Sequence, residues 1–381
     1  MVSANGWFLQ KKGISPETKK NWVKHPIFGD MRMWFLFWSV MVCAPLYAQK
    51  EYAIRTIVFY NLENLFDTKN DTLVFDDGRT PDGTYQWTAE RYQKKIGNIA
   101  KVITEIGVTS TKNGPDIIGL CEVENASVIE DLINHKLLRS HDYGMVHYDS
   151  PDERGIDVAL LYKKDAFLPT ASKSHRLLLF NEDGYRDYTR DQLLVEGFLD
   201  GEKFYFLVNH WPSRSGGELR SRPFRIKAAQ LTKRIMDSIR RDNVKAKIIS
   251  MGDFNDDPVD QSLKKVLSST GKRKQLDSLS LYNPMEKLFR KGVGTLAYRD
   301  KWNLFDQFLI TPSALDNANG YFFWKAGIFD VEWLKNQDGR FKGYPFRTYV
   351  GTTYQGGYAD HFPVYLYLIK QASPDPSKGG D

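Results

Sequence analysis

One segment of the chain, residues 247–256, constrains the fold most because it reads as a buried strand that stops abruptly at polar residues. Its sequence is KIISMGDFND, and Gly252 closes the apolar part. Side chains alternate in an extended chain, so Asp253 and Asn255 are expected to face one side while Phe254 faces the core. A carboxylate beside a carboxamide suits a water-activating base next to a neutral oxyanion donor. A plain strand-ending turn is the alternative, because Gly, Asp and Asn are common in such turns.

Five further apolar or alternating runs contain, or lead to, residues that can bind a metal or a phosphate. They are residues 54–60 before Asn61, 117–121 before Glu122, 204–208 before Asn209 and His210, 302–309 around Asp306, and 362–366 after Asp360 and His361. One polar strand end is ordinary, whereas six with this chemistry predict a shared rim where the side chains meet.

These motifs, in this order, resemble the endonuclease/exonuclease/phosphatase superfamily, which includes pancreatic deoxyribonuclease, apurinic endonucleases, inositol polyphosphate phosphatases and bacterial sphingomyelinases. The residues that carry the resemblance are Asn61, Glu122, His210, the Gly252–Asn255 box, Asp306 and the Ala359-Asp360-His361 box. They span nearly all of the expected mature chain. The resemblance implies an α/β fold, a four-layer α-β-β-α sandwich of two mixed sheets flanked by helices.

Two positions depart from the family pattern, and both bear on substrate preference. Ala359 stands where the family usually has serine, and Cys121 stands where many members have glutamine. Neither change removes a metal-binding or proton-transfer group, so only the orientation of the surrounding side chains is affected. The segment from Asn209 to Arg214, followed by residues 221–223, is similar to a secreted bacterial branch described as endonuclease-like. We therefore expect a nucleic acid substrate.

The resemblance also implies roles for the rim residues. Glu122, with Asn61 and Asp360, would hold Mg²⁺, or Mn²⁺ in its place, since carboxylate and carbonyl oxygens suit these ions. Asp253 would activate the attacking water while Asn255 donates to the developing oxyanion. His361, polarised by Asp306, would bring a proton or positive charge to the phosphate, and His210 would do similar work from the opposite side.

Each of these residues also has a plain structural interpretation. Glu122 could be an acid near the start of the following helix, and Asn61 could simply end a strand. His210, which precedes Trp211, could be a packed loop histidine. His361 could belong to a structural ion pair, and a carboxylate as buried as that of Asp306 needs a partner in either case.

Substrate contacts are predicted from the segments beside the rim. We expect Asp157 to orient His210 and Arg154 to contact a phosphate, although an exposed hairpin charge is an equal alternative for Arg154. Asn209 and Arg214 belong to the same predicted substrate surface. The long polar loops 67–86, 176–192, 211–223 and 337–357 would surround it. Several rings and guanidinium groups alternate in them, as a polynucleotide groove requires, and ordinary loop packing explains the pattern equally well.

The remaining sequence predicts one catalytic domain over residues 49–371. Strand-like runs alternate with expected helices at 87–106, 126–138 and 223–240. In the last helix apolar residues recur at helical spacing, which leaves Arg225, Lys233, Arg234 and Arg240 on the expected solvent face. The alternative from another functional class is a binding protein that has this fold but no catalytic activity. The complete set of rim residues argues against that alternative. Within the fold, the alternative function is a phosphatase or a phospholipid phosphodiesterase.

The first 48 residues have the layout of a signal peptide that begins late. Residues 31–33 precede the apolar run 34–42, and Ala48 offers a cleavage site, so we predict a signal peptide over 31–48 and an exported protein. Residues 1–30 are then an upstream extension of the gene model. A membrane anchor is the rival, but the apolar run is short for a span of about 20 residues. We expect no stable anchor after cleavage, and a disordered tail over 372–381.

Removal of residues 1–48 would also change the net charge and the number of cysteines of the mature chain. The whole chain carries a net charge of +6, and residues 1–48 contribute six Lys or Arg and two acids, so the mature net charge is +2. Nucleic acid binding therefore cannot be argued from overall charge. Cys121 alone would remain, which rules out an internal disulfide in the mature chain. No protein partner is predicted.

Overall fold

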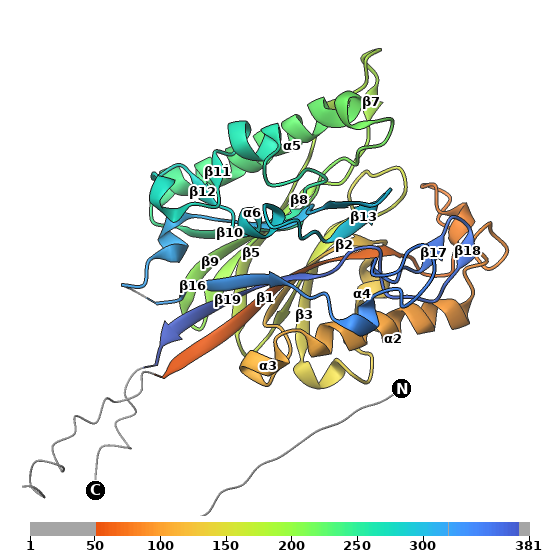
Figure 1. Ribbon diagram of the computed structural model, residues 1–381, viewed down its shortest axis with the longest axis horizontal. Helices are drawn as coiled ribbons and strands as arrows, with labels where there is room; N and C mark the ends of the chain where they lie inside the picture. Colours follow the sequence, from red (N-terminus) through yellow and green to blue (C-terminus); the bar gives the residue numbers. More distant parts are fainter. Residues whose placement is uncertain (1–50, 319, 373–381) are drawn as a thin grey trace, which may run out of the picture. The chain divides into compact units, whose positions relative to one another are not determined.

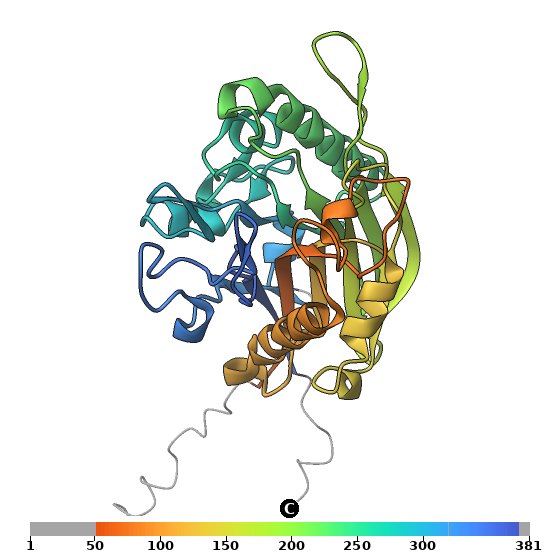
Figure 2. The ribbon, with the colours of Figure 1, turned by 90° about the vertical axis from the view of Figure 1, so that its right-hand side faces the viewer.

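Two large mixed sheets form the centre of the fold, as Figures 1 and 2 show for this computed structural model. The structure describes residues 51–318 and 320–372. The first sheet contains, in spatial order, β16 (Phe322–Ile328), β19 (Val364–Gln371), β1 (Tyr52–Leu65), β2 (Ile117–Val123), β4 (Asp157–Lys163) and β3 (Tyr143–His147). The second contains β11 (Ser269–Thr270), β12 (Leu281–Tyr282), β15 (Asp306–Ile310), β10 (Lys247–Asp253), β9 (Glu202–His210), β8 (Gln192–Leu199) and β5 (Phe167–His175).

The remaining elements are three small ribbons, the α-helices and several short helical turns. Three two-stranded ribbons pair β6 (Leu179–Phe180) with β7 (Arg186–Asp187), β13 (Leu296–Tyr298) with β14 (Lys301–Asn303), and β17 (Tyr349–Val350) with β18 (Thr353–Tyr354). The α-helices are α2 (Ala89–Glu105), α3 (Val108–Thr111), α4 (Ala126–Ile133), α5 (Glu218–Asp242) and α6 (Met285–Phe289). Short helical turns are η1 (Asp77–Arg79), η2 (Arg139–His141), η3 (Ser262–Val266), η4 (Arg273–Gln275), η5 (Pro312–Leu315) and η6 (Glu332–Leu334).

Three apolar cores hold four layers together. Between the sheets, side chains such as Phe59, Phe206 and Met251 are fully buried. A second core lies between α2, α4 and the six-stranded sheet, and a third joins α5 to the seven-stranded sheet. In Figure 1, α5 lies above the sheets and α2 below them. The predicted α/β class, with two mixed sheets flanked by helices, is confirmed.

Strand register brings the polar strand ends to one rim. Asp253 lies opposite His210 in the parallel pair of β10 and β9, and opposite Asp306 in the antiparallel pair of β10 and β15. In the other sheet Asn61 lies opposite Cys121, the residue before Glu122. Register thus aligns Asp253, His210 and Asp306 across three neighbouring strands of one sheet, and Asn61 with the residue before Glu122 in the other.

The helices differ from expectation at α4, which ends at Ile133, five residues before the predicted end, and at α5. Helix α5 begins at Glu218, five residues before the predicted start, because the Glu218 carboxylate pairs with Arg222 and Arg225 along the first turns. The expected solvent face is also wrong in part. Arg225 is fully buried and its Nε donates to Asp256 Oδ1 at 2.5 Å, and Arg240 is buried against the carbonyl of Leu279. These guanidinium groups anchor loops and are not free for a ligand.

The predicted leader lies outside the described residues, as does the tail from residue 373 onward. Among residues 51–318 and 320–372, no helix has the length and apolar character that a membrane crossing requires.

Candidate active site

An Asp–His–Asp arrangement forms the centre of the rim. His361 lies in the loop that leads into β19, and its Nδ1 lies 2.7 Å from Oδ2 of Asp306, the first residue of β15. The other ring nitrogen, Nε2, faces Oδ2 of Asp253 at 3.9 Å. All three side chains are buried, and their ligand atoms lie within 4.8 Å of one another. The last loop and two strands thus deliver one imidazole between two carboxylates.

Asn61 joins this group to Glu122 on the other sheet. Its Nδ2 donates to Asp253 Oδ2 at 3.1 Å and lies 3.5 Å from Glu122 Oε1. Glu122 has a φ of +60°, an unusual backbone for a non-glycine residue, and its other oxygen accepts the Asn64 N–H. The left-handed turn and this hydrogen bond hold the carboxylate in place. Glu122 and His361 are therefore connected through two intervening side chains in one cluster.

Burial and the neighbouring charges determine the protonation of Asp253 and His361. Burial raises the pKa of Asp253 to about 7, although His361 opposes the shift. Burial disfavours the charged form of His361, but the carboxylates of Asp306 and Asp253 outweigh it and raise the pKa of His361 well above its usual range. A proton-accepting carboxylate thus lies beside an imidazolium, which is the pairing that acid–base chemistry near neutral pH requires.

His210 is electrically different from His361. Its Nε2 lies 3.8 Å from both Glu122 Oε1 and Asp253 Oδ2. Burial, together with the positive charges of Arg190 and Arg154, lowers the pKa of His210 well below its usual value. The neutral imidazole can donate or accept a hydrogen bond, but it does not bring the positive charge that we expected from it.

Asn255 faces the same rim in a strained backbone conformation. Its φ is +50°, and its backbone N–H donates to Asp253 Oδ1 at 2.9 Å. The side-chain Nδ2 donates to the carbonyl of Trp211 at 3.0 Å. A carboxamide nitrogen carries two hydrogens, so one remains for an oxyanion.

The donor set beside Asn61 fits a divalent cation. Oxygens of Glu122 and Asp253 converge on the same amide and the same neutral histidine, and two like charges in one buried place favour a cation. Among the described residues Glu122 has no Lys or Arg within ion-pair distance. Its carboxylate is a hard ligand of the kind that Mg²⁺ and Mn²⁺ take.

Comparisons with known proteins identify the family. The profile described as Endonuclease/Exonuclease/phosphatase family matches residues 56–370. The chain belongs to the endonuclease/exonuclease/phosphatase family. Phosphoester hydrolysis is the reaction class of its members, so this chain is assigned as a hydrolase of that superfamily.

Solved structures of similar fold accompany this match. An endonuclease/exonuclease/phosphatase family protein from Bacteroides thetaiotaomicron is 20% identical, with a TM-score of 0.50, over 87% of this chain and 99% of that one. A humanised D. rerio TDP2 is 14% identical, with a TM-score of 0.50, over 83% and 98%. A mannosyl-6-phosphatase from Bacteroides thetaiotaomicron is 20% identical, with a TM-score of 0.49, over 82% and 99%. A search of curated protein sequences gave no match.

Two predicted metal ligands of this family member are engaged in other contacts. The Asn61 oxygen accepts the N–H of Glu63, while its NH₂ group faces the two carboxylates, so Asn61 acts here as a donor that holds them. Asp360 Oδ2 accepts from Arg347 at 2.8 Å. Glu122 is therefore the residue whose surroundings best fit a cation.

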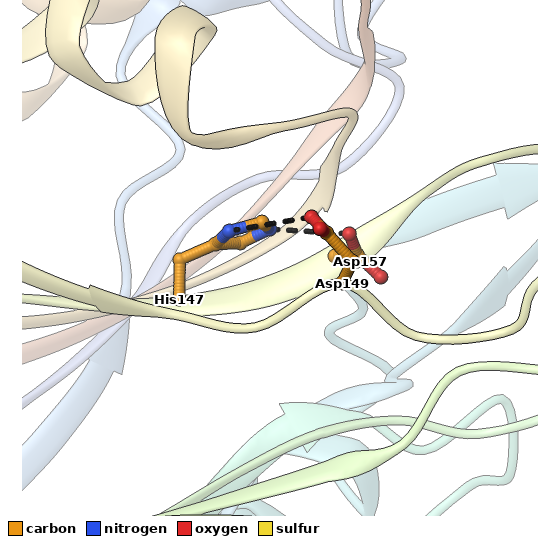
Figure 3. A group of neighbouring side chains, drawn as sticks. All are labelled: His147, Asp149 and Asp157. Atoms are coloured by element: carbon orange, nitrogen blue, oxygen red, sulfur yellow. Dashed lines mark hydrogen bonds and ion pairs between the residues drawn. The ribbon is translucent and has the colours of Figure 1, made fainter. Parts of the chain in front are cut away.

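The expected orientation of His210 by Asp157 is wrong. Figure 3 shows Asp157 facing His147, and its Oδ2 lies 3.1 Å from His147 Nε2. Its Oδ1 accepts from both the N–H and the hydroxyl of Ser150. Both oxygens are thus used to close the hairpin between β3 and β4. His210 Nδ1 has no hydrogen-bond partner within residues 51–318 and 320–372.

Asn209 and Arg214 are also corrected. Asn209 is fully buried on the opposite face of β9 from His210, where it bonds Ser250 Oγ and Thr232 Oγ1. The guanidinium of Arg214 bonds the Asn255 carbonyl at 2.9 Å and Asp260 at 2.7 Å. Both side chains are occupied by contacts within the scaffold.

Arg154 lies where a substrate contact is feasible. Its side chain is 47% exposed, and its only ion pair among the described residues is a long one, 3.7 Å to Asp152. Its charge also reaches His210, whose pKa it helps to lower. A phosphate near His210 would therefore lie within the influence of this guanidinium.

A polar network behind Asp360, whose inner members Glu63 and Lys95 are buried, was not predicted from the sequence. Arg347 joins Asp360 to Glu63, and Glu63 lies 3.9 Å from the Lys95 Nζ. Lys95 is fully buried in α2 and donates to Thr348 Oγ1 and the Tyr358 carbonyl. One signal was available: Lys95 shares a helix face with Tyr92, and a lysine on an apolar face needs a partner. Arg347 gave no such signal, because it lies in an irregular loop.

Proposed function

We propose that this protein is an exported, Mg²⁺-dependent phosphodiesterase, an endonuclease that cleaves DNA or RNA by in-line attack of an activated water. One observation carries the proposal: the imidazolium of His361 and the carboxylate of Asp253, whose pKa is about 7, face each other at 3.9 Å. A proton acceptor and a positive donor that face one place at the rim, where a phosphate and its attacking water can meet both, are what phosphodiester hydrolysis needs.

The proton movements follow from these positions. Asp253 takes a proton from the water as the water oxygen bonds to phosphorus. His361, fixed through Nδ1 by Asp306, presents Nε2–H to a phosphoryl oxygen, and the free hydrogen of Asn255 serves another. The bond between phosphorus and the leaving oxygen then breaks, and that oxygen receives a proton from His361 or solvent. His210, neutral, orients the phosphate by a hydrogen bond from the other side.

Glu122 would hold the cation, with Asp360 and Asn61 fixing its surroundings. When bound, Mg²⁺ supplies positive charge that stabilises the phosphoryl and leaving oxygens. The structure's own residues prepare this place through the Asn61 amide, which keeps two carboxylate groups oriented toward the rim. Mn²⁺ has the same ligand preference and would replace Mg²⁺.

The test uses plasmid DNA and a structured RNA as substrates. With Mg²⁺ the wild type should degrade at least one of them, and both a chelator and His361→Ala should abolish the reaction. His135→Ala, a change two residues after the end of α4, is the matched control and should retain activity. If both polymers survive while inositol phosphates or sphingomyelin are cleaved, the protein is a phosphatase or phospholipid phosphodiesterase and the nucleic acid proposal fails.

A further inference from the structure

A cleft of about 690 Å³ lies beside the candidate active site and has no role in the mechanism above. One wall is the ribbon of β6 and β7, and the other is the loop after β9 with the start of α5. The lining residues on which the argument depends are Arg154, Phe180, Tyr188, Thr189, Arg190 and Arg220. Figure 2 shows the β6–β7 loop rising beside α5 at the top of the molecule.

The inner wall of the cleft is linked directly to the catalytic loop. Arg190 donates to the carbonyl of Trp211 at 2.8 Å, and Asn255 donates to that same carbonyl at 3.0 Å. Trp211 follows His210 in sequence. Arg190 is held from behind by Asp152 at 2.9 Å, with both side chains more than nine-tenths buried. A molecule in this cleft would therefore lie next to a phosphate bound at His210.

Two buried polar groups of the cleft lack a partner. Thr189 is 3% exposed and Arg190 is 6% exposed. The Thr189 Oγ1 and the Arg190 Nε make no hydrogen bond to any residue in the described part of the chain. Unsatisfied buried polar atoms are costly and rare in folded proteins, so each such group needs an explanation. One hydroxyl and one N–H in a cleft are suited to the polar edge of a ligand.

Exposed rings form the outer part of the cleft. Phe180 is 55% exposed and Tyr188 is 48% exposed, and both line it. The guanidinium of Arg186 lies 5.9 Å from the Phe180 ring and 5.2 Å from the Tyr188 ring, which supports this pair of side chains from the ribbon. Aromatic rings on a protein surface stack with flat ligands, and each nucleobase presents such a face.

The charge of the lining excludes a track for the phosphate chain. Four acids line the cleft, Asp152, Glu153, Glu182 and Asp187, against the three arginines Arg154, Arg190 and Arg220. Since Asp152 and Arg190 neutralise each other, the remainder is close to neutral. A polyanion would need an excess of positive charge. A neutral flat ring with hydrogen-bonding atoms at its edge fits all three features.

We propose that this cleft binds the base of an unpaired nucleotide next to the scissile phosphate, with Tyr188 as the stacking surface and Thr189 and Arg190 as the edge contacts. The inference rests on the proposed nuclease function and narrows it to substrates with at least one single-stranded nucleotide at the cleavage point. A base held inside a duplex could not enter, because its face is covered by its neighbours.

The test compares two single-stranded oligonucleotides of equal length, one with all bases and one made abasic at the nucleotides flanking the cleavage point. For the complete oligonucleotide, Tyr188→Ala should lower kcat/KM about tenfold, the usual effect of losing one stacked base. Thr189→Val should lower it in the same direction. For the abasic oligonucleotide, both variants should match the wild type.

Tyr185→Ala is the control, because Tyr185 is on the same ribbon loop and 73% exposed but does not line the cleft. It should cleave both oligonucleotides as the wild type does. Equal losses for Tyr185→Ala and Tyr188→Ala, or unchanged cleavage by Tyr188→Ala, would overturn the cleft proposal while leaving the nuclease function in place. A wild type that degrades plasmid DNA or structured RNA but leaves both oligonucleotides intact would also overturn the cleft proposal alone. A wild type that degrades none of these nucleic acids would remove the nuclease function itself and the cleft proposal with it.

Discussion

At the scale of single residues, the hydrogen bond between Asp306 and His361 determines what the imidazole can do. Nδ1 of His361 is taken by Asp306 Oδ2 at 2.7 Å, so Nε2 is the nitrogen that faces the rim. Asp306 is fully buried, and its carboxylate also keeps the proton on the ring. Without the carboxylate, both the orientation and the charge of His361 would be lost.

We therefore predict that Asp306→Asn lowers kcat by about 100-fold or more, the scale of a lost acid–base group. KM should change little, because Asp306 does not reach the substrate. Steady-state hydrolysis of an oligonucleotide measures this effect. Asp165→Asn, an exposed aspartate between β4 and β5, is the matched control and should behave as the wild type. A kcat within threefold of wild type for Asp306→Asn would contradict the assigned role.

The raised pKa of Asp253 gives a second prediction at this scale. If the ionised carboxylate is the base, kcat/KM should rise about tenfold per pH unit up to about 7 and then level off. The same shift has the opposite effect on stability. Between pH 3.8 and about 7 the folded state holds the proton more tightly than the unfolded chain, so the free energy of unfolding falls as pH rises.

Asp253→Asn separates these two effects. The variant should be inactive, yet at pH 8 it should melt at a higher temperature than the wild type, because it removes a buried charge. Thermal unfolding at pH 5 and pH 8 measures the difference, which should be smaller at pH 5. A variant that is both inactive and less stable at pH 8 would show that Asp253 is held as a structural ion-pair partner.

At the scale of elements, strand ends were predictable and loops were not. Apolar runs with a polar end located Glu122, His210 and Asp253, because strand alternation and register carry such residues to one rim. The α/β layers followed from the family resemblance. The boundaries of α5 could not be predicted, since they depend on ion pairs between its first turns.

The residue roles that were predicted incorrectly, or not predicted, have identifiable physical reasons. Asn209 directly precedes His210, and alternation places it on the other face of β9, a consequence that the motif reading overlooked. The partners of Asp157 and Arg214 come from folded loops, and spacing in the sequence does not reveal which acid meets which base. The Arg347–Glu63 pair could not be predicted for the same reason, because it joins two positions far apart in the chain.

The contact between α2 and the 337–357 loop yields a prediction for an element. Lys95→Met removes the donor to Thr348 and to the Tyr358 carbonyl and leaves Glu63 without this cation. Buried groups left without partners cost about 1–3 kcal/mol each, so the melting temperature should fall by several degrees. Activity should fall too, because the loop carries the Arg347 contact to Asp360.

Lys94→Met is the matched control, since Lys94 is the exposed neighbour in the same helix. Differential scanning calorimetry on both variants measures the difference between them. Equal melting temperatures for the two variants would mean that Lys95 contributes nothing to the docking of the loop.

At the scale of the whole molecule, the candidate site is the place where the two sheets meet through polar side chains. Glu122 comes from β2 in the six-stranded sheet, while Asp253 and His210 come from β10 and β9 in the seven-stranded sheet. Their carboxylates repel each other, and the Asn61 amide offsets only part of that repulsion. A cation bound here would relieve the repulsion and tie the sheets together.

Binding of Mg²⁺ should therefore stabilise the entire fold. A ligand that binds only the folded state at 100 times its Kd adds about 2.7 kcal/mol, which should raise the melting temperature by about 5 °C. Glu122→Gln should remove this rise, and Glu130→Gln, an exposed change in α4, should retain it. Because the measurement needs no substrate, it separates cation binding from catalysis. If neither Mg²⁺ nor Mn²⁺ at millimolar concentrations changes the melting temperature of the wild type, the acidic residues of the rim have a structural role that needs no metal.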